Sequence, residues 1–323
     1  MPANLPPQYY EVEKRYRNAR TPSEKLEILE QMMAIMPKHK GTDHLRADLR
    51  RRMAQVNEEM SSAAKKGHSF RIKREGAGQI IMAGPTNAGK SRLLRALTEA
   101  APEVGNYPYV TLNATPGMMS FENVKIQLVD TPAINHRDAR ISLQSLLRTG
   151  DGILLIIDLN NEPVKQLEET LEILDEFKIV PGKEAGNPDK GIVGKQILVA
   201  SNKNDIPGTS LNHELLLRRC QNLLPVISIS AESGNGLDNL RRQVFLMLNV
   251  IRVYTKPRSG KPDLAVPVLL PVGQTVEDFA RAVHKDFLAH LKYANIWGSG
   301  KFEGQRVSRN HTLQDGDIIE LHI

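Results

Sequence analysis

The chain has 323 residues, of which 40% are apolar and 25% are charged, a composition typical of a folded globular protein. Its one cysteine, Cys220, excludes a disulfide framework within the chain and suits a reducing compartment. The longest apolar runs, such as 153–157, are far too short to cross a bilayer. We therefore expect a cytoplasmic protein without membrane contact, long enough for two or three domains.

The net charge of +6 is unevenly distributed along the chain. Residues 1–75 contain 16 Lys and Arg against 10 Asp and Glu, and residues 251–323 contain 10 against 8. The segment 76–250 between them is slightly acidic, and we expect three domains with these bounds. Basic flanking domains suit a polyanionic partner such as RNA, although solvated helix faces explain the same charge equally well.

A helical hairpin is expected in the N-terminal segment. Apolar side chains recur at three- and four-residue steps from 22 to 36, where Pro37 ends the pattern, and again from about 43 to 66. The basic turn that joins the two patterns is short, which favours an antiparallel pair of helices. A polar segment at 67–78 then forms a linker to the next domain.

The stretch 84–91 organises the rest of the chain. It follows a short apolar run at 79–83 and precedes a helical pattern at 91–100. A strand, a glycine-rich loop and a helix in this order form a phosphate-binding loop, because successive backbone N–H groups and the helix N-terminus face the anion. The residues expected to surround the phosphates are Gly84, Pro85, Thr86, Asn87, Ala88, Gly89, Lys90 and Ser91.

The ends of this loop carry the chemistry. Lys90 is expected to reach the β- and γ-phosphates, and the Ser91 hydroxyl is expected to hold Mg²⁺. A strand at 124–129 ends in Asp130, which suits a second Mg²⁺ anchor acting through water. A chance glycine-rich turn and an ordinary Asp turn are the alternatives, and the order of the elements disfavours both.

Downstream segments alternate strands and helices. Apolar runs predict strands at 153–158, 196–200 and 226–230, and an amphipathic pattern predicts a helix at 164–177. This alternation predicts an α/β domain with a mainly parallel sheet and helices on both faces. Its site is then expected at the carboxyl ends of the strands.

The segment Asn202-Lys203-Asn204-Asp205 selects the nucleotide. The Asp205 carboxylate can accept hydrogen bonds from N1–H and the 2-amino group of guanine. Adenine lacks this pair of donors and would leave the carboxylate unpaired, at a cost of about 1–3 kcal/mol. Asn202 would tie the loop together and the Lys203 stem would pack on the base, so the predicted cofactors are GTP or GDP with Mg²⁺.

Together these motifs resemble an Obg superfamily GTPase of the Drg type (developmentally regulated GTP-binding protein-like) with a C-terminal TGS domain. The resemblance covers nearly the whole chain, and the segments that carry it are 37–42, 84–91, 107–112, 130–133, 202–205, 230–232, 254–257, 276–279, 293–298 and 311–317. It implies a P-loop GTPase fold for 76–250 and a β-grasp, ubiquitin-like fold for 251–323. It also implies a ribosome or structured RNA as the partner.

The resemblance assigns further roles by position. Thr111 matches the switch threonine that completes Mg²⁺ coordination, with Thr115 as the alternative by residue type, so Lys90, Thr111 and Asp130 are the expected catalytic residues. A second group matches the loop whose backbone reads the guanine carbonyl: Ser230, Ala231 and Glu232. The family's helical insert after the third motif has no counterpart here, because only 134–150 lies there.

Two positions depart from the common GTPase pattern. Ala133 stands where the third motif usually has glycine; its N–H remains to bond the γ-phosphate, but its methyl group disfavours a positive φ and is expected to alter nucleotide-dependent switching. Ile134 stands where many GTPases carry the glutamine that orients water. Asn87 either binds a monovalent cation such as K⁺ that supports phosphoryl transfer or only shapes the turn.

The tail is expected to form strands at 266–270 and 318–323 and a helix at 276–291. Trp297 is either a core aromatic residue or a stacking surface for an RNA base. The histidines of the tail lack metal-ligand spacing with cysteine, so zinc is not expected.

Two functions follow from these motifs. The first is a ribosome- or RNA-associated switch that hydrolyses GTP slowly. The second is a GTP-dependent scaffold with vestigial hydrolysis that binds a protein partner, which the absent glutamine and Ala133 keep open.

Overall fold

The computed structural model describes residues 6–18, 22–36, 42–65, 72–98, 114–136, 139–182, 185–221 and 223–322. The described residues fall into two compact units, one made by the N-terminal helices and one by everything from Ile72 onward. The expected switch segment 107–112, which contains Thr111, lies outside the described residues, as does the basic turn at 37–41.

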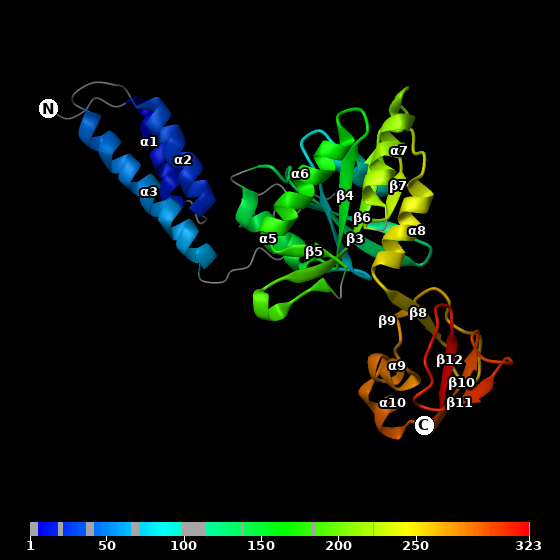
Figure 1. Ribbon diagram of the computed structural model, residues 1–323. Coiled ribbons are helices and arrows are strands. Elements are labelled where there is room, and N and C mark those ends of the chain that lie inside the picture. Colours follow the sequence, from blue (N-terminus) through cyan, green and yellow to red (C-terminus); the bar gives the residue numbers. More distant parts are fainter. Residues whose placement is uncertain are drawn as a thin grey trace. The chain divides into compact units, whose positions relative to one another are not determined.

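The N-terminal unit contains three helices, α1 (Pro7–Asn18), α2 (Pro22–Ile35) and α3 (Asp43–Lys65) (Figure 1). The apolar periodicity predicted α2 and α3, and α1 adds a third helix to the expected hairpin. The apolar pattern of α1 is short: among its residues with described burial, Tyr9 and Val12 are the two that are buried. They pack in one apolar cluster with Leu29 of α2 and Leu49 of α3.

The second unit begins with a mainly parallel sheet, as predicted. Its strands are β1 (Gln79–Ala83), β2 (Thr115–Phe121), β3 (Val124–Asp130), β4 (Gly152–Asp158), β5 (Ile179–Pro181), β6 (Val193–Asn202) and β7 (Val226–Ser228). The order is β2-β3-β1-β4-β6, and both β5 and β7 pair with β6. The pairing of β2 with β3 is antiparallel, and the other described pairings are parallel.

Helices cover both faces of this sheet. The helices are α4 (Lys90–Leu97), α5 (Arg140–Thr149), α6 (Pro163–Glu176), α7 (Thr209–Cys220) and α8 (Leu237–Met247), with a 3₁₀ turn, η4 (Pro188–Lys190). Because successive side chains of a strand point to opposite faces, Ile80 and Met82 of β1 pack with α4 and α8. Ile81 and Ala83 pack with α5, α6 and α7 on the other face. The sheet is therefore buried on both sides, as its apolar strands require.

A second, smaller sheet follows. Its strands are β8 (Val250–Thr255), β9 (Val268–Pro271), β10 (Tyr293–Trp297), β11 (Gln305–Val307) and β12 (Ile318–His322), in the order β11-β10-β12-β8-β9, with helices α9 (Val276–Val283) and α10 (Lys285–His290) (Figure 1). The single helix expected at 276–291 is wrong in one respect. His284 interrupts it with an extended backbone (φ −168°, ψ 147°), and its side chain caps α10 by accepting from the Asp286 N–H.

None of the helices in the described part of the chain is long and apolar enough to span a bilayer. Cys220, at the end of α7, is a buried free thiol.

Candidate functional site

The phosphate loop connects β1 to α4 in a conformation that needs glycine. Gly84 has a φ of 154° and Gly89 a φ of 95°, values that favour glycine. A Cβ on Gly84 would lie 2.3 Å from the carbonyl oxygen of Ile156, and one on Gly89 would lie 2.4 Å from the Asn202 Nδ2 atom. The loop therefore runs in close contact with β4 on one side and with the guanine segment on the other.

Lys90 turns its ammonium group back into the phosphate loop. Its Nζ atom donates to the carbonyl oxygens of Gly84 (3.0 Å) and Pro85 (2.8 Å), and the residue is only 7% exposed. Burial lowers the pKa of this lysine, and the nearby Asp130 carboxylate opposes that shift. A phosphate in the loop would offer this buried cation a stronger partner than two neutral carbonyls.

Ser91 and Asp130 form a pair of oxygen ligands suited to Mg²⁺. The Ser91 hydroxyl donates to Asp130 Oδ2 at 2.5 Å. The other carboxylate oxygen, Oδ1, is buried and has no hydrogen-bond partner among the described residues. Burial raises the pKa of Asp130, opposed by the Ser91 bond and by Lys90. Since Mg²⁺ prefers carboxylate and hydroxyl oxygens and keeps several waters, these two side chains fit the ion.

The segment after β3 lies against the phosphate loop. Thr131 donates to the carbonyl oxygen of Met82 at 2.7 Å, and the Ile134 N–H donates to the carbonyl oxygen of Gly84 at 3.1 Å. The Ile134 side chain is 3% exposed and packs in the core beside α5. It therefore offers no polar group to orient a water, and Ala133, one residue earlier, is half-buried.

Asn202 connects three loops of the site. Its Nδ2 donates to the carbonyl oxygen of Ala88 in the phosphate loop at 2.9 Å, and its Oδ1 accepts from the N–H of Ala231 at 3.0 Å. The side chain is only 2% exposed. Asp205, three residues further on, is exposed and so is open to a base. The structure thus brings the predicted phosphate and guanine residues to one end of the sheet.

The loop from Ser230 to Glu232 is internally bonded. The Ser230 hydroxyl accepts from the N–H groups of Glu232 (3.1 Å) and Ser233 (3.0 Å), and the Glu232 carboxylate pairs with Arg92 of α4. The Ala231 N–H is held by Asn202. Reading a guanine carbonyl with this backbone therefore requires one of these bonds to be shared or exchanged.

Thr111 lies outside the described residues, so the structure does not place it. Thr115, the alternative by residue type, is the first residue of β2 and pairs with Asp130 across the β2–β3 ladder. It therefore lies beside the expected Mg²⁺ anchor.

The sequence did not single out Asp158, which ends β4 and supports the guanine segment. Its Oδ2 lies 2.6 Å from the Lys203 Nζ atom. The Gln166 amide accepts from the Asp158 N–H and donates to the Asp158 carbonyl oxygen, both at 3.0 Å. Asp158 and Gln166 are each 8% exposed, so the contact is largely shielded from water. The sequence signal that could have identified Asp158 is its place at the end of an apolar strand, like that of Asp130 at the end of β3.

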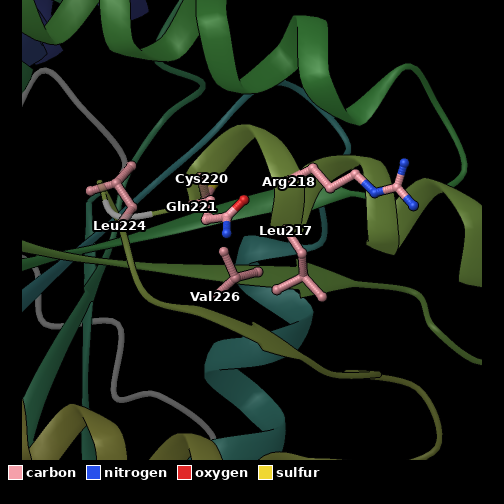
Figure 2. Close-up of a pocket in the computed structure, with 6 residues that line it drawn as sticks. All are labelled: Leu217, Arg218, Cys220, Gln221, Leu224 and Val226. Atoms are coloured by element: carbon pink, nitrogen blue, oxygen red, sulfur yellow. The ribbon is translucent and has the colours of Figure 1, made fainter.

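A hollow of about 410 Å³ lies elsewhere, at the end of α7 and the start of β7 (Figure 2). Its lining residues are Leu217, Arg218, Cys220, Gln221, Leu224 and Val226. The Arg218 side chain extends away from the others in Figure 2, and burial raises the pKa of the Cys220 thiol, which fits an inert thiol. None of the lining residues belongs to the phosphate or guanine loops.

Two family models match the chain. Residues 79–183 match the 50S ribosome-binding GTPase family, and residues 251–323 match the TGS domain. A solved structure, a GTP-binding protein from Pyrococcus horikoshii OT3, covers 76% of this chain and 99% of its own with a TM-score of 0.53 at 16% identity. That likeness supports the fold.

Curated relatives match along most of the chain. An uncharacterized GTP-binding protein of Methanocaldococcus jannaschii is 29% identical over 93% of this chain and 92% of its own. The developmentally-regulated G-protein 3 of Arabidopsis thaliana is 28% identical, and the developmentally-regulated GTP-binding protein 2 of Homo sapiens is 27% identical, each over 92% of this chain and 98% of its own. These matches confirm the resemblance that the motifs indicated.

Proposed function

Because the chain is a homologue of the Drg-type GTP-binding proteins and carries a GTPase domain followed by a TGS domain, we propose that it is a switch that hydrolyses GTP slowly and associates with ribosomes or structured RNA. Under this proposal residues 76–250 bind the nucleotide, and residues 1–75 and 251–323 contact the partner in the cytoplasm.

One observation carries the nucleotide part of the proposal. The Asn202 side chain bonds both the phosphate loop and the loop at 230–232, so the groups that bind phosphates and the groups that read the base are held in one frame. Asp205 follows at the same end of the sheet with its carboxylate exposed. A base that presents two donors to this carboxylate binds well, which favours guanine over adenine.

The hydrolysis machinery is incomplete in the described residues, which supports slow turnover. Ser91 and Asp130 would hold Mg²⁺, which neutralises charge on the phosphate oxygens when bound. Lys90 supplies a second positive charge at the same loop. The side chain at position 134 cannot orient the attacking water, because Ile134 is apolar and buried. Under this proposal a partner or a cation completes the site.

Asn87 is placed to recruit such a cation. It lies in the phosphate loop with a φ of 62°, is exposed, and makes no hydrogen bond through its amide within the described residues. Its side-chain oxygen is thus available to K⁺ beside the phosphates. A purely conformational role, in which asparagine tolerates the left-handed backbone, is the alternative.

Single-turnover GTP hydrolysis with Mg²⁺, measured in K⁺ and in Na⁺ and each with and without ribosomes, tests the proposal. We expect faster hydrolysis with ribosomes, and faster hydrolysis in K⁺ than in Na⁺. The Asn87→Ala variant should retain GTP binding but lose the difference between the two cations. Equal rates in K⁺ and Na⁺ would exclude the cation role, and equal rates with and without ribosomes would exclude ribosomal stimulation.

A GTP-dependent scaffold remains the second candidate, because Ile134 is buried and Ala133 replaces the usual glycine. Tight GTP binding without hydrolysis in any of these conditions, together with GTP-dependent capture of a protein partner, would favour the scaffold over the switch.

A further inference from the structure

The C-terminal sheet has one face in the core and one face toward solvent. Alternate residues of β10, Ala294 and Ile296, are fully buried and pack with Phe279 of α9. Tyr293 and Trp297 alternate with them and are only half-buried. Since successive side chains of a strand point to opposite faces, these two aromatic rings lie on the face away from α9.

Three planar side chains form a row across that outer face. The Tyr293 and His322 rings stack with centroids 4.4 Å apart and planes 10° from parallel. The Arg306 guanidinium carbon lies 3.7 Å from the Tyr293 ring centroid. Because β10 lies between β12 and β11, the tyrosine ring is held between the imidazole and the guanidinium. We call Arg306, Tyr293 and His322 the stacking row.

The stacking row is anchored at one end and open at the other. His322 Nε2 lies 2.7 Å from Glu320 Oε1, and Glu320 is only 7% exposed, which fixes the imidazole. Arg306 stands on β11, an edge strand that pairs only with β10, and it is exposed. Its guanidinium makes no ion pair with a described residue, so one of its two flat faces is available to a further planar group.

A second aromatic surface lies on the same face, about 13 Å away along β10. The Trp297 ring has the Lys256 Nζ atom 4.6 Å from its centroid. The turn after β10 passes close to the indole, because a Cβ on Gly304 would lie 3.3 Å from the Trp297 Cζ2 atom. Phe302 in this turn is 66% exposed.

We propose that this outer face binds single-stranded RNA, with one base stacking on the exposed Arg306 guanidinium and a second base close to Trp297. Unpaired bases stack readily on aromatic rings and on guanidinium planes, and the arginine charge attracts the RNA backbone at the same time. The exposed Lys292 and Lys301 add positive charge at the two ends of β10. This proposal rests on the RNA association proposed above and assigns it a surface.

The only tryptophan of the chain, Trp297, reports binding directly. The experiment titrates the full chain, with GTP present, with an eight-nucleotide oligoadenylate, and follows tryptophan emission and the anisotropy of labelled RNA. An abasic strand of the same length and an RNA duplex are the comparison ligands. We expect saturable quenching by the intact strand and at least about fivefold weaker binding of the abasic strand, because each stacked base contributes about that factor or more. A DNA strand of the same bases tests whether the ribose matters.

Conservative variants separate stacking from charge. Arg306→Lys keeps the charge but removes the plane, and should weaken binding of the intact strand about fivefold while leaving the abasic strand unchanged. Phe302→Ala should also weaken binding of the intact strand and leave binding of the abasic strand unchanged. Arg218→Lys, an arginine on α7 outside this face, is the matched control and should have no effect. An unchanged thermal unfolding midpoint in all three variants shows that they fold, because GTP affinity reports on residues 76–250 and not on the C-terminal sheet.

Two outcomes would overturn the stacking proposal: equal affinity for intact and abasic strands, or no binding of any oligonucleotide. Ribosome association is measured separately by co-sedimentation. If ribosomes bind but oligonucleotides do not, the stacking proposal fails and the proposed switch stands. If oligonucleotides bind with the expected base dependence but ribosomes do not, the stacking proposal stands and the ribosomal partner is wrong.

Discussion

At the residue scale, the nucleotide site depends on buried side chains that hold exposed ones in place. Asn202 and Asp158 are both under 10% exposed and neither needs to contact the nucleotide for its effect. Asn202 joins two loops, and Asp158 fixes the Lys203 ammonium. The exposed residues, Asp205 and Asn87, are then free to bind ligands.

Replacing Asp158 by Asn should weaken GTP binding about fivefold. The change keeps the shape of the side chain but removes the charge that holds Lys203 Nζ at 2.6 Å. A hydrogen bond between charged groups contributes about 1.5–3 kcal/mol. Only part of this free energy contributes to nucleotide binding. Equilibrium titration with a fluorescent guanine nucleotide measures this. Asp189→Asn, at the exposed turn η4, is the control, and equal affinities of the two variants would contradict the role of Asp158.

Asp205→Asn should reduce GTP affinity by at least about a hundredfold, because the amide cannot accept both guanine donors. The same variant should bind xanthine nucleotides better than the parent protein does, since xanthine offers a carbonyl oxygen where guanine has the 2-amino group. Competition titrations with GTP and with xanthosine triphosphate provide the measurement. A variant that keeps its GTP affinity would show that Asp205 does not read the base.

At the element scale, β1, its loop and α4 work as one rigid unit packed against β4. The close approach of Gly84 to the Ile156 carbonyl oxygen leaves no room for a side chain. The conformation of the loop therefore depends on β4 staying in register beside β1.

Gly84→Ala should lower the thermal midpoint by several degrees and abolish tight GTP binding, because the new methyl group would lie 2.3 Å from a backbone oxygen. Gly191→Ala is a matched control. Its φ is also positive, at 67°, but nothing lies within 4 Å of the added atom, so it measures the backbone strain alone, about 1 kcal/mol. Thermal unfolding and GTP titration of both variants separate the two effects, and equal losses would rule out the steric explanation.

The strand β12 carries a pH-dependent contact. The Lys256 ammonium, followed by His322, holds the pKa of Glu320 below its ordinary value, against the effect of burial. A depressed carboxylate pKa stabilises the folded state above the unfolded value of about 4.3, and this stabilisation is lost as the pH falls through the folded pKa. Glu320→Gln should lower stability at pH 7 and flatten its decline below about pH 5. Thermal midpoints between pH 3 and 7 test this, with the exposed Glu303→Gln as control; parallel curves would refute it.

Most elements were predictable because their signals are local. The strands β1 and β4 are nearly continuous apolar runs, and their burial on both faces explains why. In β3 the apolar residues alternate with Lys125 and Gln127, and β6 is continuously apolar only at 197–200. β2 was missed because its sequence begins Thr115-Pro116-Gly117 and resembles a loop; proline is tolerated there because β2 is an edge strand. The break at His284 depends on a side-chain cap that periodicity does not reveal.

The candidate site divides in the same way. The phosphate and guanine loops could be predicted from the sequence because nucleotide binding of this kind constrains both residue type and spacing. The support that Asp158 and Gln166 give to the guanine segment could not be predicted. It depends on β4 lying beside β6 and on the position of one glutamine on α6. Spatial neighbours that are eight and 45 residues apart leave no pattern in a single sequence.

At the scale of the whole molecule, charge is concentrated away from the catalytic segment. The net charge of +6 arises in residues 1–75 and 251–323, while 76–250 is slightly acidic. An anionic partner would therefore be attracted by the flanking domains, and the nucleotide would be bound by the segment between them. Salt should affect these two interactions very differently.

Raising NaCl from 50 to 200 mM at a constant K⁺ concentration should weaken ribosome association at least about tenfold, because every phosphate contact releases a condensed counterion. GTP affinity should change little over the same range, since Lys90, the cation of the phosphate loop, is only 7% exposed and buried charges are screened less by salt. Co-sedimentation and nucleotide titration at matched salt concentrations measure the two quantities. A salt-independent ribosome affinity would point to a protein surface of the ribosome rather than to its RNA.

The bonds of Asn202 have a consequence for nucleotide exchange. Because the Asn202 side chain bonds both Ala88 and Ala231, the protein itself holds the phosphate loop against the loop at 230–232, and little conformational entropy is lost in holding these two loops together when GTP binds. Association of GTP with these two loops should then approach the rate set by diffusion. The dissociation rate of GDP, measured directly, would then limit how fast bound nucleotide is exchanged.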